Sequence, residues 1–216
     1  MAQRTGSSLV FLAAGGTGGH LFPAEALTIA LTRRGILVDL VTDERANRYG
    51  AFPGRATHII PSATFAGRNP FRIASATFEL GLGTVKALSL LGRLHPTAVV
   101  GFGGYPTIPP LLAAVLRSVP TVIHEQNGVL GRANRLLGPR VQAIATGFDG
   151  LFADNPQLAA KATHTGNPIR PVVIAAAATP YPGADGPLRQ FERAGVDTIQ
   201  DRYEIMAGGG VLGAGE

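Results

Sequence analysis

The chain of 216 residues contains no cysteine, which excludes a disulfide framework, a thiolate metal site and a thiol nucleophile. No apolar run reaches the roughly 18–20 residues that a membrane-spanning helix needs. Charged residues make up only 15% of the chain and hydrophobic residues 45%, which is not the composition of a disordered protein. We therefore expect a globular protein with a sizeable core, made and kept in the cytoplasm.

The net charge of +5 is unevenly distributed along the chain. Residues 50–140 contain nine Lys or Arg and two acidic residues, whereas residues 185–216 contain three basic and six acidic residues. A local basic excess suits partners that carry phosphate, or an anionic membrane surface. Ordinary solubility charge is the alternative interpretation.

Short apolar runs alternate with helical patterns as far as about residue 170. The expected strands are Leu9–Ala13, Leu37–Thr42, His58–Ile60, Ala98–Val100, Thr121–His124 and Ala143–Thr146. The expected helices are Ala24–Arg34, Phe71–Arg93, Leu111–Arg117 and Ala133–Leu137. This alternation predicts an α/β fold with a doubly wound parallel sheet, which binds ligands at the carboxyl ends of its strands.

The pattern weakens towards the carboxyl end. Residues 179–187 hold three prolines and two glycines, which is typical of a linker. We therefore expect one domain over residues 1–175, followed by a linker and tail over residues 176–216.

Two glycine-rich loops follow expected strands. Gly15–His20 joins the first strand to the first helix, and Gly101–Tyr105 follows a later strand. Glycines let backbone amides approach a ligand closely, and a helix amino end favours an anion. The first loop is not followed by the Lys-Ser/Thr of a P-loop, and Leu21 stands where the dinucleotide fingerprint needs glycine. Two such loops at one sheet edge predict a cleft floored by backbone; tight packing between strand and helix is the alternative.

Four polar residues in a row, His124, Glu125, Gln126 and Asn127, stand at the end of an apolar strand. Glu125 is a candidate base or sugar-hydroxyl ligand, and Asn127 is able to donate and accept hydrogen bonds. A mutual hydrogen-bond network that orders the loop is the alternative, since buried polar groups need partners. Arg170 offers a bidentate donor for a phosphate, although an arginine beside a proline turn is commonly solvated.

The expected helix Phe71–Arg93 combines apolar residues with a basic rim. The rim consists of Arg68, Arg72, Lys86 and Arg93, with only Glu79 opposing. Apolar and basic residues together are typical of an interfacial membrane contact. A helix that simply faces the core is the alternative.

Taken together, these loops resemble the MurG family of bacterial glycosyltransferases, over roughly Ser8 to Val173. The residues that carry the resemblance are Gly15-Gly16-Thr17-Gly18-Gly19-His20, Gly103-Gly104-Tyr105, His124-Glu125-Gln126-Asn127 and Gly166-Asn167-Pro168-Ile169-Arg170. The resemblance implies the Rossmann-like amino-terminal half of a GT-B fold. It also implies inverting transfer of GlcNAc from UDP-GlcNAc to lipid I, the undecaprenyl-pyrophosphoryl-MurNAc-pentapeptide, giving lipid II. Such an enzyme serves peptidoglycan synthesis, and with it cell wall biogenesis, cell shape and cell division.

The resemblance also assigns roles to residues. It implies UDP-GlcNAc contacts at Thr17, Gly18, Gly19, Asn127 and Arg170, acceptor contacts at Gly103, Gly104, Tyr105 and Gln126, and catalytic roles for His20 and Glu125. Attack by a sugar hydroxyl needs a base, for which His20 is the candidate and Glu125 the rival. We expect no cofactor and no metal, since no Asp-x-Asp pair is present. The implied place is peripheral, on the anionic cytoplasmic face of the bacterial inner membrane, without a nucleic-acid partner.

The chain departs from the family pattern from Leu188 onward. In the family a second domain follows and supplies most of the uridine site, so we expect a truncated or aberrant carboxyl end and no activity in this chain alone. Two alternatives stay open. One is a non-catalytic lipid- or membrane-binding module; the other is a nucleotide-dependent oxidoreductase in which Asp43 holds a ribose.

Overall fold

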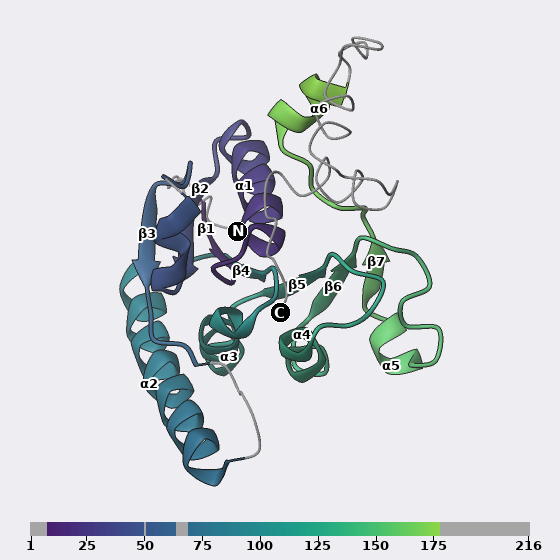
Figure 1. Cartoon of the computed structure of the whole chain (residues 1–216). Coiled ribbons are helices and arrows are strands. Elements are labelled where there is room, and N and C mark those ends of the chain that lie inside the picture. The colour runs from purple at the N-terminus through teal and green to yellow at the C-terminus, as the bar shows by residue number, and fades with distance from the viewer. Residues whose placement is uncertain (1–7, 50, 64–68, 178–216) are drawn as a thin grey trace, which may run out of the picture. The chain divides into compact units, whose positions relative to one another are not determined.

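The computed structural model describes residues 8–49, 51–63 and 69–177. Within these ranges a seven-stranded sheet has the order β3-β2-β1-β4-β5-β6-β7, and every pair of neighbours is parallel (Figure 1). The strands are β1 Leu9–Ala13, β2 Leu37–Thr42, β3 Ala56–Ile59, β4 Ala98–Gly101, β5 Thr121–Glu125, β6 Ala143–Thr146 and β7 Ala162–His164. The helices are α1 Gly18–Thr32, α2 Pro70–Leu94, α3 Ile108–Leu116, α4 Arg132–Leu137, α5 Pro156–Ala159 and α6 Pro171–Ala177, with 3-10 turns at Glu44–Tyr49 and Tyr105–Thr107.

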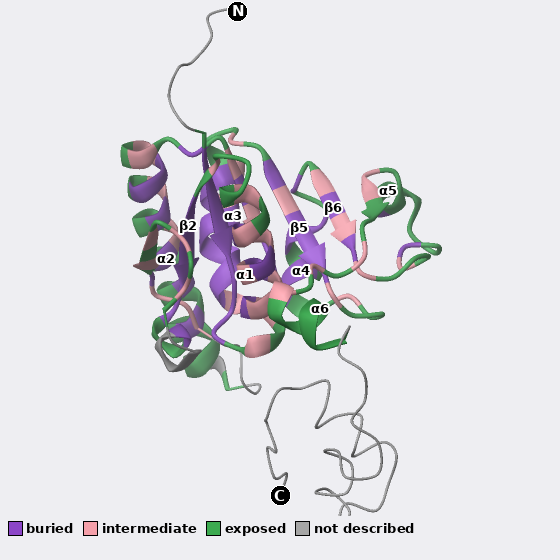
Figure 2. Ribbon diagram, turned by 90° about the horizontal axis from the view of Figure 1, so that it is seen from above, coloured by how far each residue is buried: buried purple, intermediate pink, exposed green. Residues whose placement is uncertain are grey.

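Helices cover both faces of the sheet. Phe11 of β1 packs into a cluster with Leu91 of α2 and Leu111 of α3, whereas its neighbour Leu12 packs into a second cluster with Leu21 of α1. Successive strand residues point to opposite faces, so β1, all of whose residues are buried, is covered on both. Strands β2 and β5 are also largely buried (Figure 2). The predicted doubly wound parallel sheet is confirmed.

Some element bounds differ from those expected. Helix α1 begins at Gly18 rather than Ala24, so Pro23 lies inside the helix. Helix α3 begins at Ile108 and takes two prolines into its first turn, where a missing N–H costs little. Strand β7 was not expected, because its three residues are short of apolar side chains and partly exposed.

The chain divides into two compact units between Pro171 and Val172. The first contains all seven strands and the site described below. The expected boundary at residue 175, and the linker and tail over 176–216, stay predictions; residues 178–216 lie outside the described ranges.

The edge of the sheet at β3 is held by a buried carboxylate on β2. The Asp39 side chain is fully buried and accepts two hydrogen bonds from Arg55, at 2.8 and 2.7 Å, and one from His58 Nε2 at 2.8 Å. Burial by itself raises the pKa of Asp39, but the bonds from Arg55 and His58 outweigh it and hold the pKa below its ordinary value of 3.8. The carboxylate therefore stabilises the folded protein in its charged form.

We expect Asp39→Asn to lower the free energy of unfolding at pH 7 by roughly 1–2 kcal/mol, a range that allows for the exposure of Arg55. A carboxyl group with a lowered folded-state pKa stabilises the fold above its unfolded-state pKa, and this contribution is lost as the pH falls through the folded-state value. The difference between wild type and variant should therefore shrink below about pH 4. Urea unfolding at several pH values measures it, with exposed Asp154→Asn as the control. A difference that stays constant down to pH 2 would contradict this account.

Candidate functional site

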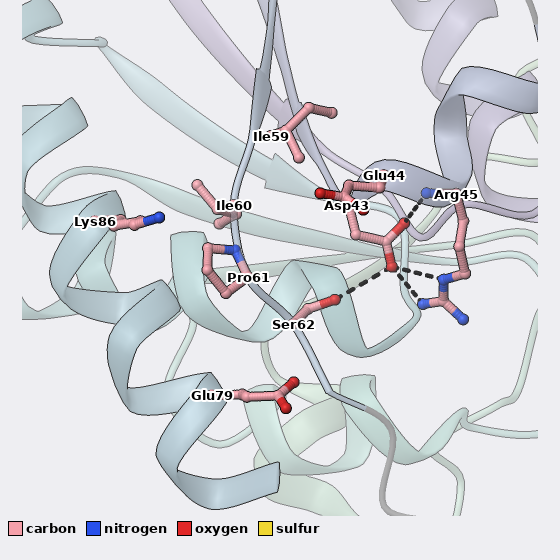
Figure 3. A pocket seen from close by; sticks show the side chains of 9 residues that line it. All are labelled: Asp43, Glu44, Arg45, Ile59, Ile60, Pro61, Ser62, Glu79 and Lys86. Carbon is pink, nitrogen blue, oxygen red and sulfur yellow. Dashed lines mark hydrogen bonds and ion pairs between the residues drawn. The ribbon is translucent and has the colours of Figure 1, made fainter. Parts of the chain in front are cut away.

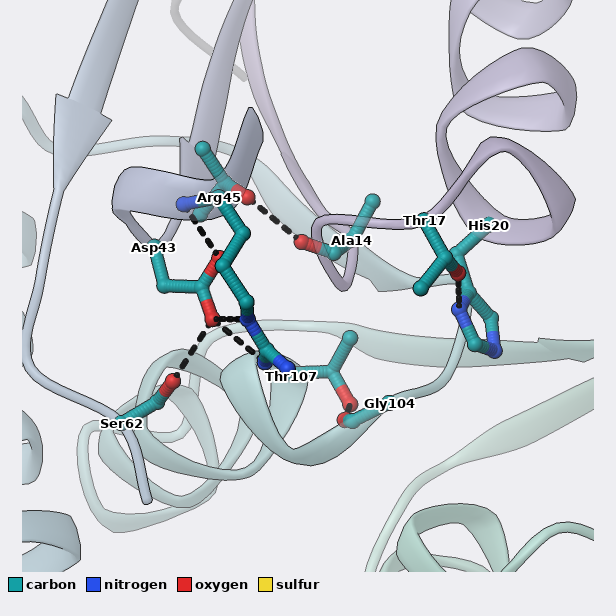
Figure 4. A network of polar contacts seen from close by, with 9 residues as sticks. Ala14, Thr17, His20, Asp43, Arg45, Ser62, Gly104 and Thr107 are labelled. Carbon is teal, nitrogen blue, oxygen red and sulfur yellow. Dashed lines mark hydrogen bonds and ion pairs between the residues drawn. The ribbon is translucent and has the colours of Figure 1, made fainter. Parts of the chain in front are cut away.

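The two glycine-rich loops touch at the carboxyl edge of the sheet, because β1 and β4 are neighbours. The N–H of Gly15 donates to the carbonyl of Gly103 at 3.1 Å. Gly104 has a φ of 78°, and a Cβ there would lie 3.0 Å from Gly15 Cα. Thr107 Oγ1 donates to the Gly104 carbonyl at 2.7 Å and holds this backbone in place (Figure 4). The sequence offered two interpretations of these glycines, a ligand cleft and tight packing between strand and helix. The structure shows tight packing, but between the two loops rather than between a strand and a helix.

His20 lies in the first turn of α1, above the second glycine loop. Its Nδ1 lies 2.8 Å from Thr17 Oγ1 (Figure 4). A Cβ on Gly103 would lie 3.1 Å from His20 Nε2, so glycine makes room for the ring. Burial lowers the pKa of His20 below 6.5, the charge of Glu125 opposes this change and the charge of Arg45 adds to it. The imidazole is therefore neutral at pH 7, as a base must be, and burial is the main cause of the shift.

A hollow of about 250 Å³ opens beside the His20 ring. Its lining includes both candidate bases, His20 and Glu125, and three of the four expected acceptor contacts, Gly103, Gly104 and Tyr105. The expected UDP-GlcNAc contact Asn127 also lines it, together with Gly131, Arg132, Ala133 and Asn134 of the next loop and α4. We call this the His20 hollow. The structure thus brings together residues from three loops that are far apart in the sequence.

Glu125 is buried at the end of β5 and accepts four hydrogen bonds. Oε1 accepts from the backbone N–H of Asn127 at 3.1 Å and from its side-chain amide at 3.0 Å. Oε2 accepts from the N–H of Gly131 and from Asn134 Nδ2, both at 2.9 Å. Because every partner is a donor, an added proton would displace one of them. The four bonds tie Glu125 to residues 127, 131 and 134, so this carboxyl group orders the loop after β5.

Asn134 is a residue of the His20 hollow that the sequence did not single out. Its Nδ2 donates to Glu125 Oε2 and to the His124 carbonyl, which fixes the orientation of the amide. Its Oδ1 is buried and accepts no hydrogen bond from the described residues. A buried acceptor without a partner costs about 1–3 kcal/mol, which a ligand hydroxyl would offset. In the sequence, Asn134 is an ordinary polar residue within a helical stretch, so no local signal marks it.

The remaining polar residues after β5 hold the loop together. His124 Nε2 donates to the Gly166 carbonyl at 3.0 Å, and Gln126 Nε2 lies 3.1 Å from His124 Nδ1. Burial lowers the pKa of His124, although the bond to Gly166 and the charge of Glu125 raise it. Gln126 therefore binds its own loop and does not line the His20 hollow.

Arg170 lies apart from the His20 hollow, against helix α1. Its guanidinium carbon is 3.8 Å from the centre of the Phe22 ring, and Nη1 is 3.6 Å from Glu25 Oε2. Phe22 in turn contacts Gly18, where a Cβ would lie 2.9 Å from the ring. The expected UDP-GlcNAc contacts thus separate: Arg170 lies near the start of α1 with Gly18, and Asn127 lies on the other side, in the His20 hollow.

The other expected residues are placed as follows. Arg72 and Arg93 are exposed on α2, Lys86 lines a second hollow, and Arg68 lies outside the described residues. Asp43 accepts from Arg45 Nε at 2.7 Å and from Ser62 Oγ at 3.2 Å, so its carboxylate is already engaged. Among the described residues, no three His, Asp or Glu side chains are grouped to hold a metal ion. No described helix is both long enough and apolar enough to cross a membrane.

A parallel sheet with glycine loops and polar groups along its carboxyl edge defines an α/β domain of the nucleotide- or sugar-binding class. Residues 10–146 match the glycosyltransferase family 28 N-terminal domain, and the chain belongs to this family. The resemblance inferred from the loops is confirmed. The oxidoreductase alternative is wrong, as the engaged carboxylate of Asp43 also indicates.

Relatives agree with this family. The chain is 60% identical over 188 residues to the UDP-N-acetylglucosamine–N-acetylmuramyl-(pentapeptide) pyrophosphoryl-undecaprenol N-acetylglucosamine transferase of Rhodopseudomonas palustris, covering 86% of this chain and 51% of that one. The crystal structure of Acinetobacter baumannii MurG is 29% identical, with a TM-score of 0.60 over 76% of this chain and 45% of that one. A UDP-GlcNAc 2-epimerase from Neisseria meningitidis, 16% identical with a TM-score of 0.56 over 91% of this chain and 52% of that one, shares the fold. The chain therefore spans about half the length of the relatives that it matches.

We expect Glu125→Gln to loosen the loop after β5. A glutamine side chain would turn an NH₂ group towards N–H donors and lose two of the four bonds. The free energy of unfolding should fall by roughly 1–3 kcal/mol, and amide hydrogen exchange at Asn127 and Gly131 should quicken. Asp154→Asn is the control. Unchanged exchange at these two amides would show that Glu125 does not order the loop.

Proposed function

We propose that this chain is the acceptor-binding half of a glycosyltransferase that moves GlcNAc from UDP-GlcNAc to lipid I, forming lipid II. The family match and the name of the Rhodopseudomonas palustris relative support the donor and the acceptor. The observation that carries the proposal is the His20 hollow, which is lined by the neutral imidazole of His20 and by Asn134, whose buried Oδ1 has no hydrogen-bond partner among the described residues. One acts as a proton acceptor and the other as a hydroxyl ligand.

In this proposal the acceptor hydroxyl donates its hydrogen bond to His20 Nε2. The Nδ1–H then donates to Thr17 Oγ1, which fixes both the tautomer and the ring. A second sugar hydroxyl donates to Asn134 Oδ1. The oxygen attacks the anomeric carbon of GlcNAc as the bond to UDP breaks, and His20 takes the proton, so the configuration inverts.

The leaving diphosphate needs donors where its charge develops. The N–H groups of Gly18 and Gly19 begin the 15-residue helix α1 and make no hydrogen bond within the described residues. They point from the positive end of the helix dipole, which favours an anion. Arg170 stands nearby on Phe22. These groups supply the electrostatic stabilisation that a metal supplies in other transferases. Most of the uridine site is assigned to a second half such as the relatives possess.

An exposed apolar stripe on α2 supports a second role, as a peripheral contact with an anionic membrane. Phe71 is 84% exposed, Phe78 74% and Val85 62%, although Leu80 and Leu91 of the same helix are buried in the core. The helix thus carries one buried apolar stripe and one exposed apolar stripe (Figure 2). A helix that only faced the core would lack the exposed one. With Arg72 and Arg93 it has the composition of a membrane-surface helix. Such a contact would bring the His20 hollow close to a lipid-linked acceptor at the cytoplasmic face of the membrane.

The transferase is tested in a protein that joins residues 1–175 to the carboxyl-terminal half of the Rhodopseudomonas palustris relative. We expect GlcNAc transfer to a lipid I analogue by the joined protein and none by the 216-residue chain. His20→Ala should lower kcat by about 10²–10⁴-fold, since a positioned base is worth that much. Because burial lowers the pKa of His20, kcat/KM should be lost on the acid side only at a pH below 6.5, where His20 becomes protonated.

His164→Ala, at an exposed histidine on β7, is the matched control and should keep its rate. Full activity of His20→Ala would remove His20 as the base. Transfer by the 216-residue chain itself would show that the second half is dispensable.

Membrane binding is tested by sedimentation with anionic phospholipid vesicles. Each basic residue near such a surface contributes about 1 kcal/mol, so Arg72→Gln and Arg93→Gln should each weaken binding about 5-fold. Phe78→Ser should weaken it further, and salt should weaken the wild type. The control is Arg34→Gln, the same change at an exposed residue just after α1; this variant should bind vesicles as the wild type does. Equal binding by all variants would mean that α2 is not the contact.

A further inference from the structure

A second hollow, larger than the first, opens on the other side of the first glycine loop. Its volume is about 430 Å³, and it lies between the ends of β2 and β3 and the middle of α2. We call it the Lys86 hollow. Figure 3 shows Lys86 and Glu79 reaching from α2 towards the segment Ile59–Ser62, with Asp43 and Arg45 on the far side. None of these side chains takes part in the mechanism described above.

The walls of the Lys86 hollow are held in place by backbone contacts. A Cβ on Gly16 would lie 2.5 Å from Arg45 Cβ and 2.7 Å from Asp43 Oδ1, so the glycine loop packs directly against this wall. A Cβ on Gly83 would lie 2.2 Å from the Pro61 carbonyl oxygen, so only glycine lets α2 come this close. Gly15 packs against Gly104 and His20 on its other side, so the loop from Gly15 to Thr17 lies between the walls of the two hollows, and we call it the partition.

The charges in the Lys86 hollow are partly engaged and partly free. Arg45 is paired with Asp43, which also accepts from Ser62 (Figure 4). Lys86, Glu79 and Glu44 make no hydrogen bond or ion pair with any other described residue. The buried Ile60 and the half-exposed Ile59 supply an apolar wall. Free groups thus comprise one cation and two carboxylates beside an apolar surface.

The charged and apolar groups of the Lys86 hollow indicate which class of ligand it would bind. A diphosphate would meet more acidic than basic groups, so the Lys86 hollow disfavours it. A peptide suits it better, because the terminal carboxylate pairs with the ammonium group and backbone N–H groups donate to carboxylates. The acceptor in the name of the Rhodopseudomonas palustris relative carries a pentapeptide on the same sugar that receives GlcNAc.

We propose that the Lys86 hollow binds the peptide of the acceptor, with a peptide carboxylate at Lys86 and peptide N–H groups directed to Glu79 and Glu44. This inference rests on the proposed function, which places the muramyl sugar in the neighbouring His20 hollow. The sugar and its peptide then lie on the two sides of the Gly15–Thr17 partition. The hollow distinguishes a peptide-bearing acceptor from a bare glycolipid.

The test measures binding of soluble fragments to the ¹⁵N-labelled 216-residue chain by NMR. The probes are N-acetylmuramic acid, N-acetylmuramyl-pentapeptide and the same peptide with its terminal carboxylate amidated. We expect N-acetylmuramic acid to shift the amides of His20 and Tyr105 only. The pentapeptide should in addition shift the amides of Ile60, Ser62 and Glu79.

Variants separate Lys86 from a general effect of charge. Lys86→Gln should weaken binding of the pentapeptide about 2- to 5-fold, the range for one partly exposed ion pair, and should leave binding of the amidated peptide unchanged. Glu79→Gln should weaken binding of both peptides. Arg34→Gln and Asp154→Asn, which make the same charge changes elsewhere on the surface, should bind as wild type does.

The outcomes distinguish this inference from the proposed function. Pentapeptide shifts confined to the His20 hollow would overturn the peptide site and leave the acceptor site standing. Absence of shifts with every probe would overturn both. An equal loss for the free and amidated peptides in Lys86→Gln would overturn the pairing of Lys86 with the carboxylate.

Discussion

The close approach of backbone to backbone at the first glycine loop is the constraint on which the site depends. A Cβ on Gly104 would lie 3.0 Å from Gly15 Cα, and a Cβ on Gly16 would lie only 2.5 Å from Arg45 Cβ and 2.7 Å from Asp43 Oδ1. Any side chain there would separate β1 from the loops after β4 and β2. The loop therefore lies between residues that line the two hollows. Its glycines Gly15 and Gly16 act through close packing.

Buried polar groups in this domain serve two different ends. Glu125 and Asp39 are buried but fully engaged, so each holds a segment of backbone in place. Asn134 is equally buried, and one of its atoms is left without a partner among the described residues. An engaged carboxylate is a structural element, because moving it breaks several bonds at once. In our proposal the unpartnered Oδ1 of Asn134 serves binding, because a ligand hydroxyl would donate to it. The two kinds are in contact here, since Glu125 orients Asn134.

Helix α2 connects the site to its surroundings through two stripes. One stripe packs on the sheet, and Gly83 on that side lets Pro61 approach. The opposite stripe exposes Phe71 and Phe78. Lys86 and Glu79 lie between them and close the Lys86 hollow. In our proposals a single helix therefore contributes to the core, to the membrane contact and to the peptide site. From the sequence, this helix was expected either to face the core or to contact a membrane. The spacing of apolar residues alone does not show which of them are covered by other parts of the chain.

The sequence by itself determined the parallel sheet, the position of most strands and the two glycine loops, because apolar runs and glycines are local signals. Through the resemblance to a known family it also singled out His20, Glu125 and Asn127 as candidate site residues, which the structure places in the lining of one hollow. Only the tertiary structure decided that Glu125 is saturated with donors and that Arg170 packs on Phe22, away from the His20 hollow. It alone revealed Asn134 and the Lys86 hollow. The physical reason is that hydrogen-bond satisfaction and enclosure depend on which segments meet, and strand order, not sequence distance, decides which segments meet.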